Sequence, residues 1–173
     1  MRTTIGLALL LAACSGASSA GRTTARGDGV PSPPSPWEQM DAAAKREWMA
    51  QEVLPRMSEL FRSQGSERYA DFSCATCHGP SPQDRGFEMP SPALPALYPT
   101  GTPEQQQMVQ QYEAQCRFMF SRVLPTMQAL LGAPDYDEAT QEGFSCYSCH
   151  PHAGDEGSTP IRLGSSSEGD AAP

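Results

Sequence analysis

Two short stretches of the chain share a pattern of cysteine and histidine that could hold an iron porphyrin. Residues 72–78 read Phe-Ser-Cys-Ala-Thr-Cys-His, and residues 144–150 read Phe-Ser-Cys-Tyr-Ser-Cys-His. Each copy contains Cys-x-x-Cys-His, the attachment signal of a c-type haem. Cysteines three positions apart lie on one face of a helical turn, so both sulfurs can form thioethers with one porphyrin. The histidine that follows can offer a ring nitrogen to the iron.

The two motifs predict two covalent haem c groups, each with a proximal histidine. The residues expected to hold them are Cys74 and Cys77 with His78, and Cys146 and Cys149 with His150. Two other interpretations of paired cysteines exist. A thioredoxin-like redox pair needs a βαβ context, which the sequence does not indicate. A shared Cys₄ zinc site would not require a histidine directly after each second cysteine.

The ligand on the opposite side of each iron is expected to be a methionine. The chain has three histidines, and His152 lies too close to His150 to reach the far face of the same ring, so we expect it in solvent. His/Met ligation is usual for c-type haems that transfer electrons. The expected pair is Met57 and Met127, with Met49 and Met119, or Met89 for the first haem, as alternatives. One methionine of each helix pair would then only fill the core.

The first residues indicate export and a lipid anchor. Residues 1–13 combine Arg2 with a short apolar run, which is typical of a signal peptide and too short to span a bilayer. The run ends Leu-Ala-Ala-Cys, so Cys14 is the expected lipidation residue. The mature protein would be anchored to the bacterial cell envelope, facing the periplasm or the exterior. Cys116 is the one cysteine without an assigned role, and we expect it to be a buried, unreactive thiol.

Composition separates a folded part from polar ends. Residues 14–35 are rich in Ser, Gly, Thr and Pro and predict a flexible tether, and residues 153–173 predict a disordered tail. The net charge of −8 argues against a nucleic-acid partner and is compatible with a basic redox partner protein.

Two helices are predicted, each before one motif. The first should begin with Ser35 as N-cap, kink at Pro55 and end at Gly65. The second should begin with Thr102 as N-cap and end at Gly132. Its apolar side should include Met108, Met119, Phe120, Val123 and Leu130. Between the helices, six prolines from residue 80 to residue 99 exclude regular structure, but apolar residues among them predict packing over a haem edge.

The two halves form an internal repeat. Residues 49–57 read Met-Ala-Gln-Glu-Val-Leu-Pro-Arg-Met, and residues 119–127 read Met-Phe-Ser-Arg-Val-Leu-Pro-Thr-Met. We therefore expect a mostly α fold of two units, 36–101 and 102–152, each a kinked helix, a loop and a haem-binding turn. Each unit is too small for a core of its own, and a haem would supply the missing apolar surface.

This order of elements resembles the multihaem cytochrome subunit of photosynthetic reaction centres, in which a helix methionine upstream of the motif is the sixth ligand. The stretches 72–79, 87–95 and 119–127 also look like those of dihaem cytochrome c lipoproteins of myxobacterial type. The resemblance covers roughly residues 37 to 152 and implies electron transfer. It departs from the reaction-centre subunit in having two motifs and not four.

The expected function is thus electron transfer without catalysis, by a dihaem protein with low-spin irons. A dihaem peroxidase-like enzyme would need an iron with an open position and distal acid–base groups, which the shortage of histidines disfavours. A haem-based gas or redox sensor would need a weak methionine ligand that leaves. The proline-rich segment has no counterpart after His150, so the first haem is expected to be the better shielded.

Overall fold

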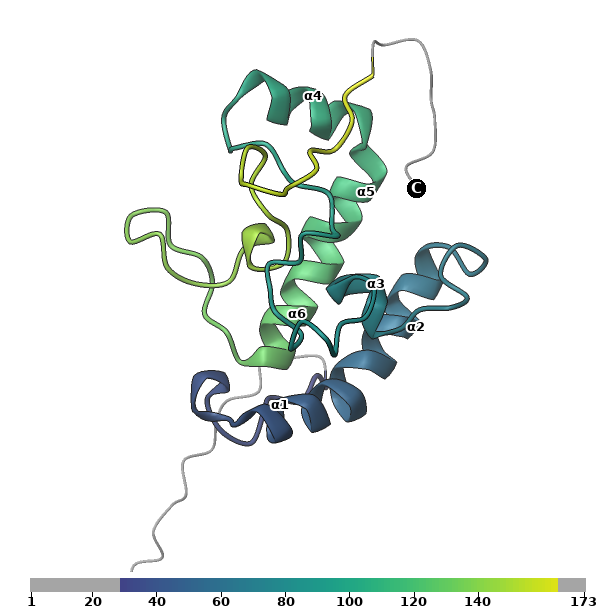
Figure 1. The fold of residues 1–173 in the computed structure, drawn as a ribbon, viewed down its shortest axis with the longest axis vertical. Helices are drawn as coiled ribbons and strands as arrows, with labels where there is room; N and C mark the ends of the chain where they lie inside the picture. The colour runs from purple at the N-terminus through teal and green to yellow at the C-terminus, as the bar shows by residue number, and fades with distance from the viewer. Residues whose placement is uncertain (1–28, 165–173) are drawn as a thin grey trace, which may run out of the picture.

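The structure is a computed structural model that describes residues 29–164, and its regular elements are helices (Figure 1). This confirms the mostly helical class. Between residues 29 and 164 the extended pairings are isolated bridges, and no β-strand forms. In the same range no helix is both long and apolar enough to cross a bilayer. The predicted signal peptide 1–13, Cys14, tether residues up to 28 and tail residues 165–173 lie outside the described residues.

The first long helix consists of α1 (Ala42–Trp48), a π-helical turn η2 (Met49–Val53) and α2 (Leu54–Gln64). It ends before Gly65 as predicted, but the cap predicted at Ser35 is wrong. The carboxylate of Asp41 accepts the amide hydrogens of two successive residues, at 2.9 and 2.8 Å. A carboxylate also suits the positive end of the helix dipole. Residues before it form only a separate 3₁₀ turn, η1 (Trp37–Gln39).

The second long helix consists of α4 (Pro103–Gln111), α5 (Glu113–Phe118), a π-helical turn η3 (Met119–Val123) and α6 (Leu124–Leu131). The predicted ends are confirmed. Thr102 accepts the amide of Gln105 at 3.2 Å, and Gly132 ends α6 in the left-handed conformation that glycine favours. A break at Tyr112 was not predicted. Its hydroxyl donates to the Arg162 carbonyl at 2.7 Å, a contact with the far end of the chain.

Each π turn lies directly before a proline. The amide of Leu54 donates to the Met49 carbonyl, and the amide of Leu124 donates to the Met119 carbonyl, five residues back in both cases. Proline has no amide hydrogen, and its ring clashes with the carbonyl four residues earlier. A wider turn relieves that clash while the helix continues. At the position of the predicted kink, the structure has a π turn that ends two residues before Pro55.

One apolar cluster lies between the two long helices. Its buried members are Val53, Met57, Phe61, Phe118 and Leu130. The ring of Phe61 contacts the rings of Tyr69, Phe72 and Phe118, with centroid distances of 5.0, 4.9 and 5.2 Å. The predicted units therefore contribute to a common core. Phe120 was predicted on the apolar side but is 72% exposed, because Met119 and Val123 take the inward positions of the π turn.

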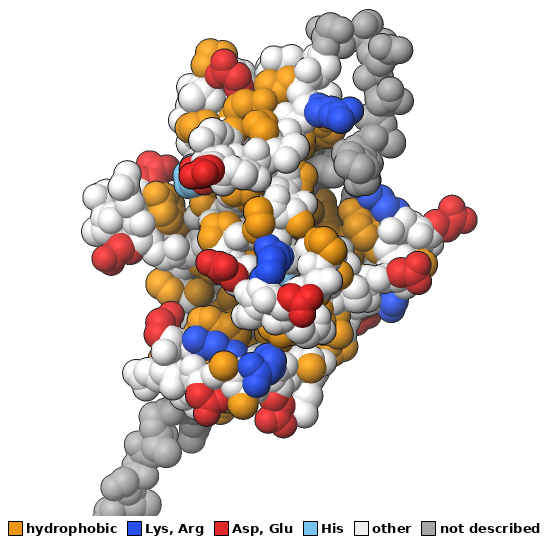
Figure 2. Space-filling view, in the orientation of Figure 1, with side chains coloured by type: hydrophobic (Ala, Val, Ile, Leu, Met, Phe, Trp, Pro, Cys, Tyr) orange, Lys and Arg blue, Asp and Glu red, His pale blue; other side chains and the backbone are white. Residues whose placement is uncertain are grey.

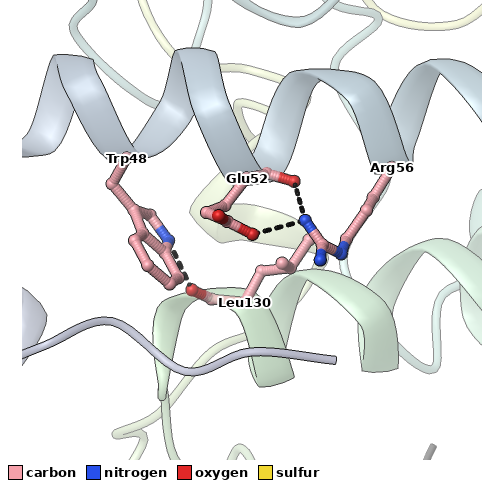
Figure 3. A network of polar contacts seen from close by, with 4 residues as sticks. All are labelled: Trp48, Glu52, Arg56 and Leu130. Atoms are coloured by element: carbon pink, nitrogen blue, oxygen red, sulfur yellow. Dashed lines mark hydrogen bonds and ion pairs between the residues drawn. The ribbon is translucent and has the colours of Figure 1, made fainter. Parts of the chain in front are cut away.

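A hydrogen bond ties the first long helix to the end of the second (Figure 3). The indole nitrogen of Trp48 donates to the Leu130 carbonyl at 2.8 Å. That carbonyl belongs to the last turn of α6, where the helix itself supplies no partner. One turn further along the first helix, Arg56 contacts the backbone and carboxylate of Glu52. This ion pair joins residues of the same helix. The hydrogen bond of Trp48, by contrast, connects the first long helix to the second.

Both predicted polar ends contact the helical part of the chain or the proline-rich segment where the structure describes them. Val30, in the predicted tether, packs against the core cluster. In the predicted tail, Ala153 and Ile161 donate backbone hydrogen bonds to Leu97 and Ala96, at 2.9 and 3.1 Å. Ala96 in turn donates to the Thr159 carbonyl at 2.8 Å and is fully buried. Small polar residues thus fold here by backbone pairing, which composition does not reveal.

Replacing the N-cap of α1 tests the corrected helix start. Asp41→Ala removes both side-chain hydrogen bonds, and we expect the free energy of unfolding to fall by about 1 kcal/mol. Urea unfolding of the purified full-length protein, followed by circular dichroism, measures this. Ser35→Ala is the matched control and should change stability by less than about 0.5 kcal/mol. A larger loss for Ser35→Ala than for Asp41→Ala would contradict the assignment.

Candidate haem-binding site

The first motif is a capped helical turn, α3 (Cys74–His78). Ser73 precedes it in extended conformation, and the hydroxyl of Thr76 accepts the Ser73 amide at 3.0 Å. This is one bond of a capping box, which fixes the start of a short helix. The turn holds Cys74 and Cys77 at the helical spacing on which the sequence argument depends.

The second motif is a similar but tighter turn, η4 (Cys146–Ser148), of 3₁₀ type. Its capping box uses Ser145 and Ser148, whose amide and hydroxyl are 3.0 Å apart. The Ser145 hydroxyl also accepts the Tyr147 amide at 3.2 Å. The shared pattern Ser-Cys-x-(Thr or Ser)-Cys-His is therefore a capping signature as well as an attachment signal, and sequence reasoning missed that part.

The two proximal histidines have different surroundings. Nδ1 of His150 lies 2.9 Å from the Pro95 carbonyl, which leaves Nε2 as the nitrogen for a metal. Nδ1 of His78 is buried near the Phe87 backbone without a hydrogen bond of normal geometry. The Phe87 ring stands edge-on to the His78 ring, with centroids 5.4 Å apart.

Burial keeps both imidazoles neutral near pH 7. It lowers the pKa of His150, although the Pro95 carbonyl opposes this. It also lowers the pKa of His78, which the Phe87 backbone opposes and the charge of Arg85 reinforces. A metal ligand must be neutral imidazole, so this protonation state suits iron binding.

Burial raises the pKa of three of the motif thiols, Cys77, Cys146 and Cys149. Burial raises the pKa of Cys77 to about 11, with the nearby Cys74 adding to the shift. Burial raises the pKa of Cys149 to about 12, and charges at Cys77 and Cys146 add to it. Cys77 is thus near enough to Cys149 to contribute to this shift. Cys146 is the most exposed of the four.

The leftover thiol of Cys116 is only partly buried. Burial and the nearby Cys146 raise its pKa, as expected of an unreactive thiol. His152 is exposed as predicted, and its ring stacks on that of Tyr147 at a centroid distance of 3.7 Å. Tyr147 also donates a hydrogen bond to the Tyr98 carbonyl at 2.9 Å.

The four methionines of the repeated helix segment, which are the predicted ligands and their alternatives in the helices, belong to the apolar cluster or pack against it. Met57 is 3% exposed and belongs to the buried set, while Met49, Met119 and Met127 are partly buried against it. Met89 is partly buried in the proline-rich segment, outside this cluster. The ligand role of Met57 and Met127 stays a prediction, with the other three as alternatives.

The proline-rich segment contacts both motifs. On the first motif, Arg85 donates to the His78 carbonyl. On the second, Ser91 donates its amide to the Cys149 carbonyl at 3.0 Å, and Leu97 donates to the Pro151 carbonyl at 2.9 Å. The residues that line the site beyond the motifs are thus Arg85, Ser91 and Pro95. Nothing in their spacing marks them in the sequence.

Gly79 allows this segment to close over the first motif. Its φ is +78°, and a Cβ there would lie 2.5 Å from the Ala93 Cβ and 3.3 Å from the Ser91 hydroxyl. The residue after the histidine must therefore be glycine for two reasons, backbone conformation and space.

The donor set fits covalent haem attachment. Each motif offers two cysteines on one turn and a histidine, and the Pro95 carbonyl is an outer partner for the second nitrogen of His150. Among residues 29–164, no three His, Cys, Asp or Glu side chains are grouped in the way that could hold a metal ion. Comparison with protein-family models, curated proteins and solved structures finds no match to the chain.

Substitution of two glycines separates backbone strain from crowding. We expect Gly79→Ala to lower the free energy of unfolding by about 3 kcal/mol, because it adds a steric clash to an unfavourable φ. Gly86→Ala is the control, since Gly86 has φ +62° but no atom within 4 Å of its Cβ position. It should cost only about 1 kcal/mol. Equal losses in urea unfolding would contradict the close packing at Gly79.

Proposed function

We propose that this protein transfers electrons through two covalently bound c-type haems. The observation that supports this most is the pair of capped Cys-x-x-Cys-His turns, both contacted by residues 85–91 of the proline-rich segment. Two attachment turns that contact the same intervening segment suit the passage of electrons from one iron to the other. Haem, when bound, supplies a one-electron couple between ferric and ferrous iron.

The chain's own residues would fix the cofactors and set their environment. Cys74 and Cys77 would hold the first haem, and Cys146 and Cys149 the second. The Nε2 atoms of the two motif histidines would face the irons, with the Pro95 carbonyl orienting His150. The apolar cluster would limit water around the methionine side of each haem, which contributes to the reduction potential.

The same residues disfavour an enzyme of the peroxidase type. The chain holds three histidines, and two of them are committed to the motifs. The third, His152, is exposed and stacked on Tyr147 and would not act as a distal acid or base. Electron exchange needs no such group, so it is the better supported function.

The proposed partners are other redox proteins, met outside the cytoplasm from a lipid anchor on Cys14. The net charge of −8 suits a basic partner and not nucleic acid. Figure 2 shows acidic side chains at separate places on one face, with hydrophobic side chains exposed between them. Such a mixed surface suits brief, weak encounters of redox proteins.

The haem content is tested by mass spectrometry of protein made in a host with a haem-ligation system. We expect the mature protein to exceed its polypeptide mass by two haems. Replacing Cys74 and Cys77 by Ala should remove one haem, and replacing Cys146 and Cys149 should remove the other. Cys116→Ala is the control and should keep both. The bare polypeptide mass for the unaltered chain would refute the proposal.

The sixth ligands are tested by substitutions that preserve volume. Met57→Leu and Met127→Leu should each remove the low-spin His/Met signature of one haem, seen in electron paramagnetic resonance and optical spectra, because leucine has no thioether. The core should tolerate the change at a cost below about 1.5 kcal/mol. Met108→Leu alters a methionine that is 6% exposed and outside the predicted set, and should leave both signatures intact. Loss of the signature in Met49→Leu and Met119→Leu instead would assign the ligands to those residues.

A further inference from the structure

One pair of side chains in the proline-rich segment, the partly buried Arg85 and the buried Ser91, connects the two motifs. Nη2 of Arg85 donates to the carbonyl of His78, the last residue of the first motif, and lies 3.4 Å from the Ser91 hydroxyl. The amide of Ser91 donates to the carbonyl of Cys149 in the second motif at 3.0 Å. Ser91 is completely buried. A continuous path of polar contacts thus runs from one motif to the other through Arg85 and Ser91.

Among the described residues, no carboxylate pairs with the guanidinium of Arg85. Arg56, by contrast, pairs with Glu52, and Arg117 pairs with Glu113. Arg85 contacts a carbonyl and a hydroxyl instead. It lines a groove of about 370 Å³ whose walls include Glu88, Asp155 and Glu156, but its contacts run inward to the motifs.

An unpaired cation beside a haem site acts on the iron potential. Ferric haem carries one more positive charge than ferrous haem, so a nearby cation disfavours the ferric form and raises the reduction potential. The effect is strong where burial excludes water, as at Ser91 and Gly79. Arg85 touches the first motif directly and the second only through Ser91, so the first haem should respond more.

We infer that Arg85 is a positioning and charge-tuning residue that raises the potential of the first haem and, through Ser91, holds the two motifs in register. This inference depends on the proposed dihaem function. Arg85 is not expected to touch the iron or to take part in any chemical step. Its role is to fix the His78 backbone and to place one positive charge at the junction.

The test is a redox titration of the haem-loaded full-length protein, with visible spectra as readout. In Arg85→Gln the equilibrium constant for reduction of one haem should fall at least threefold, and that of the other haem should change less. Arg85→Met provides a second neutral side chain in case the first variant does not load haem. Arg85→Lys keeps the charge and should stay within twofold of the unaltered protein. Arg56→Gln removes an equal charge from the ion pair with Glu52 and should also stay within twofold.

A double variant tests the connection through Ser91. Ser91→Ala removes the hydroxyl but keeps the amide that Cys149 needs. If the hydroxyl acts through Arg85, the variant carrying both Arg85→Gln and Ser91→Ala should shift no further than Arg85→Gln alone. If Ser91→Ala shifts the reduction equilibrium further in the Arg85→Gln background, the proposed link between Arg85 and the Ser91 hydroxyl is wrong. A response of Arg85→Gln and Arg85→Met equal to that of Arg56→Gln would overturn the charge role. Absence of haem in the unaltered protein would instead refute the proposed function.

Discussion

The packing of aromatic rings around Phe61 determines where the first motif and the two long helices lie. Its contacts with Tyr69 and Phe118 are edge-to-face, at interplanar angles of 78° and 89°. Such pairs contribute roughly 0.5–1.5 kcal/mol each beyond the burial of area. Phe72 precedes the Ser73 cap of α3, and Phe118 ends α5. One ring on α2 therefore fixes the start of the first motif and the position of the second helix.

The second motif has the same sequence pattern but a different support. The position that corresponds to Phe61 in the repeat is Leu131, which cannot make ring contacts. In place of rings, Gln128 donates to the Phe144 carbonyl at 3.3 Å, and backbone pairing with residues 91–97 holds the other side. The repeat in sequence therefore does not extend to the interactions that position each turn.

Local signals made part of this structure predictable. The N-cap at Thr102, the stop at Gly132 and the turn of the first motif depend on a few neighbouring residues, and each lies where the pattern places it. The start of the first helix was misjudged because Ser35 and Asp41 both satisfy the rule for a cap, and only packing decides between them. The π turns follow from proline, but sequence alone predicts a kink without its form.

The rest of the site depends on contacts between residues distant in sequence. His150 and Pro95 are 55 positions apart, and the two atoms that meet are a ring nitrogen and a backbone carbonyl. Every residue has a backbone carbonyl, so no sequence pattern could have shown that the carbonyl of Pro95 meets His150. The same holds for Ser91, whose amide meets Cys149, and for the ordered part of the predicted tail.

The pairing of residues 151–161 with Ala96 and Leu97 affects the order in which the molecule can be completed. These residues follow both cysteine pairs in the sequence, so a ribosome makes them after the two motifs. A nascent chain that stops after His150 lacks the Pro151 and Thr159 carbonyls that Leu97 and Ala96 use as acceptors. The surroundings of the first turn can therefore form from residues that precede the second motif to a larger extent, whereas those of the second turn are complete only once residues 151–161 are present.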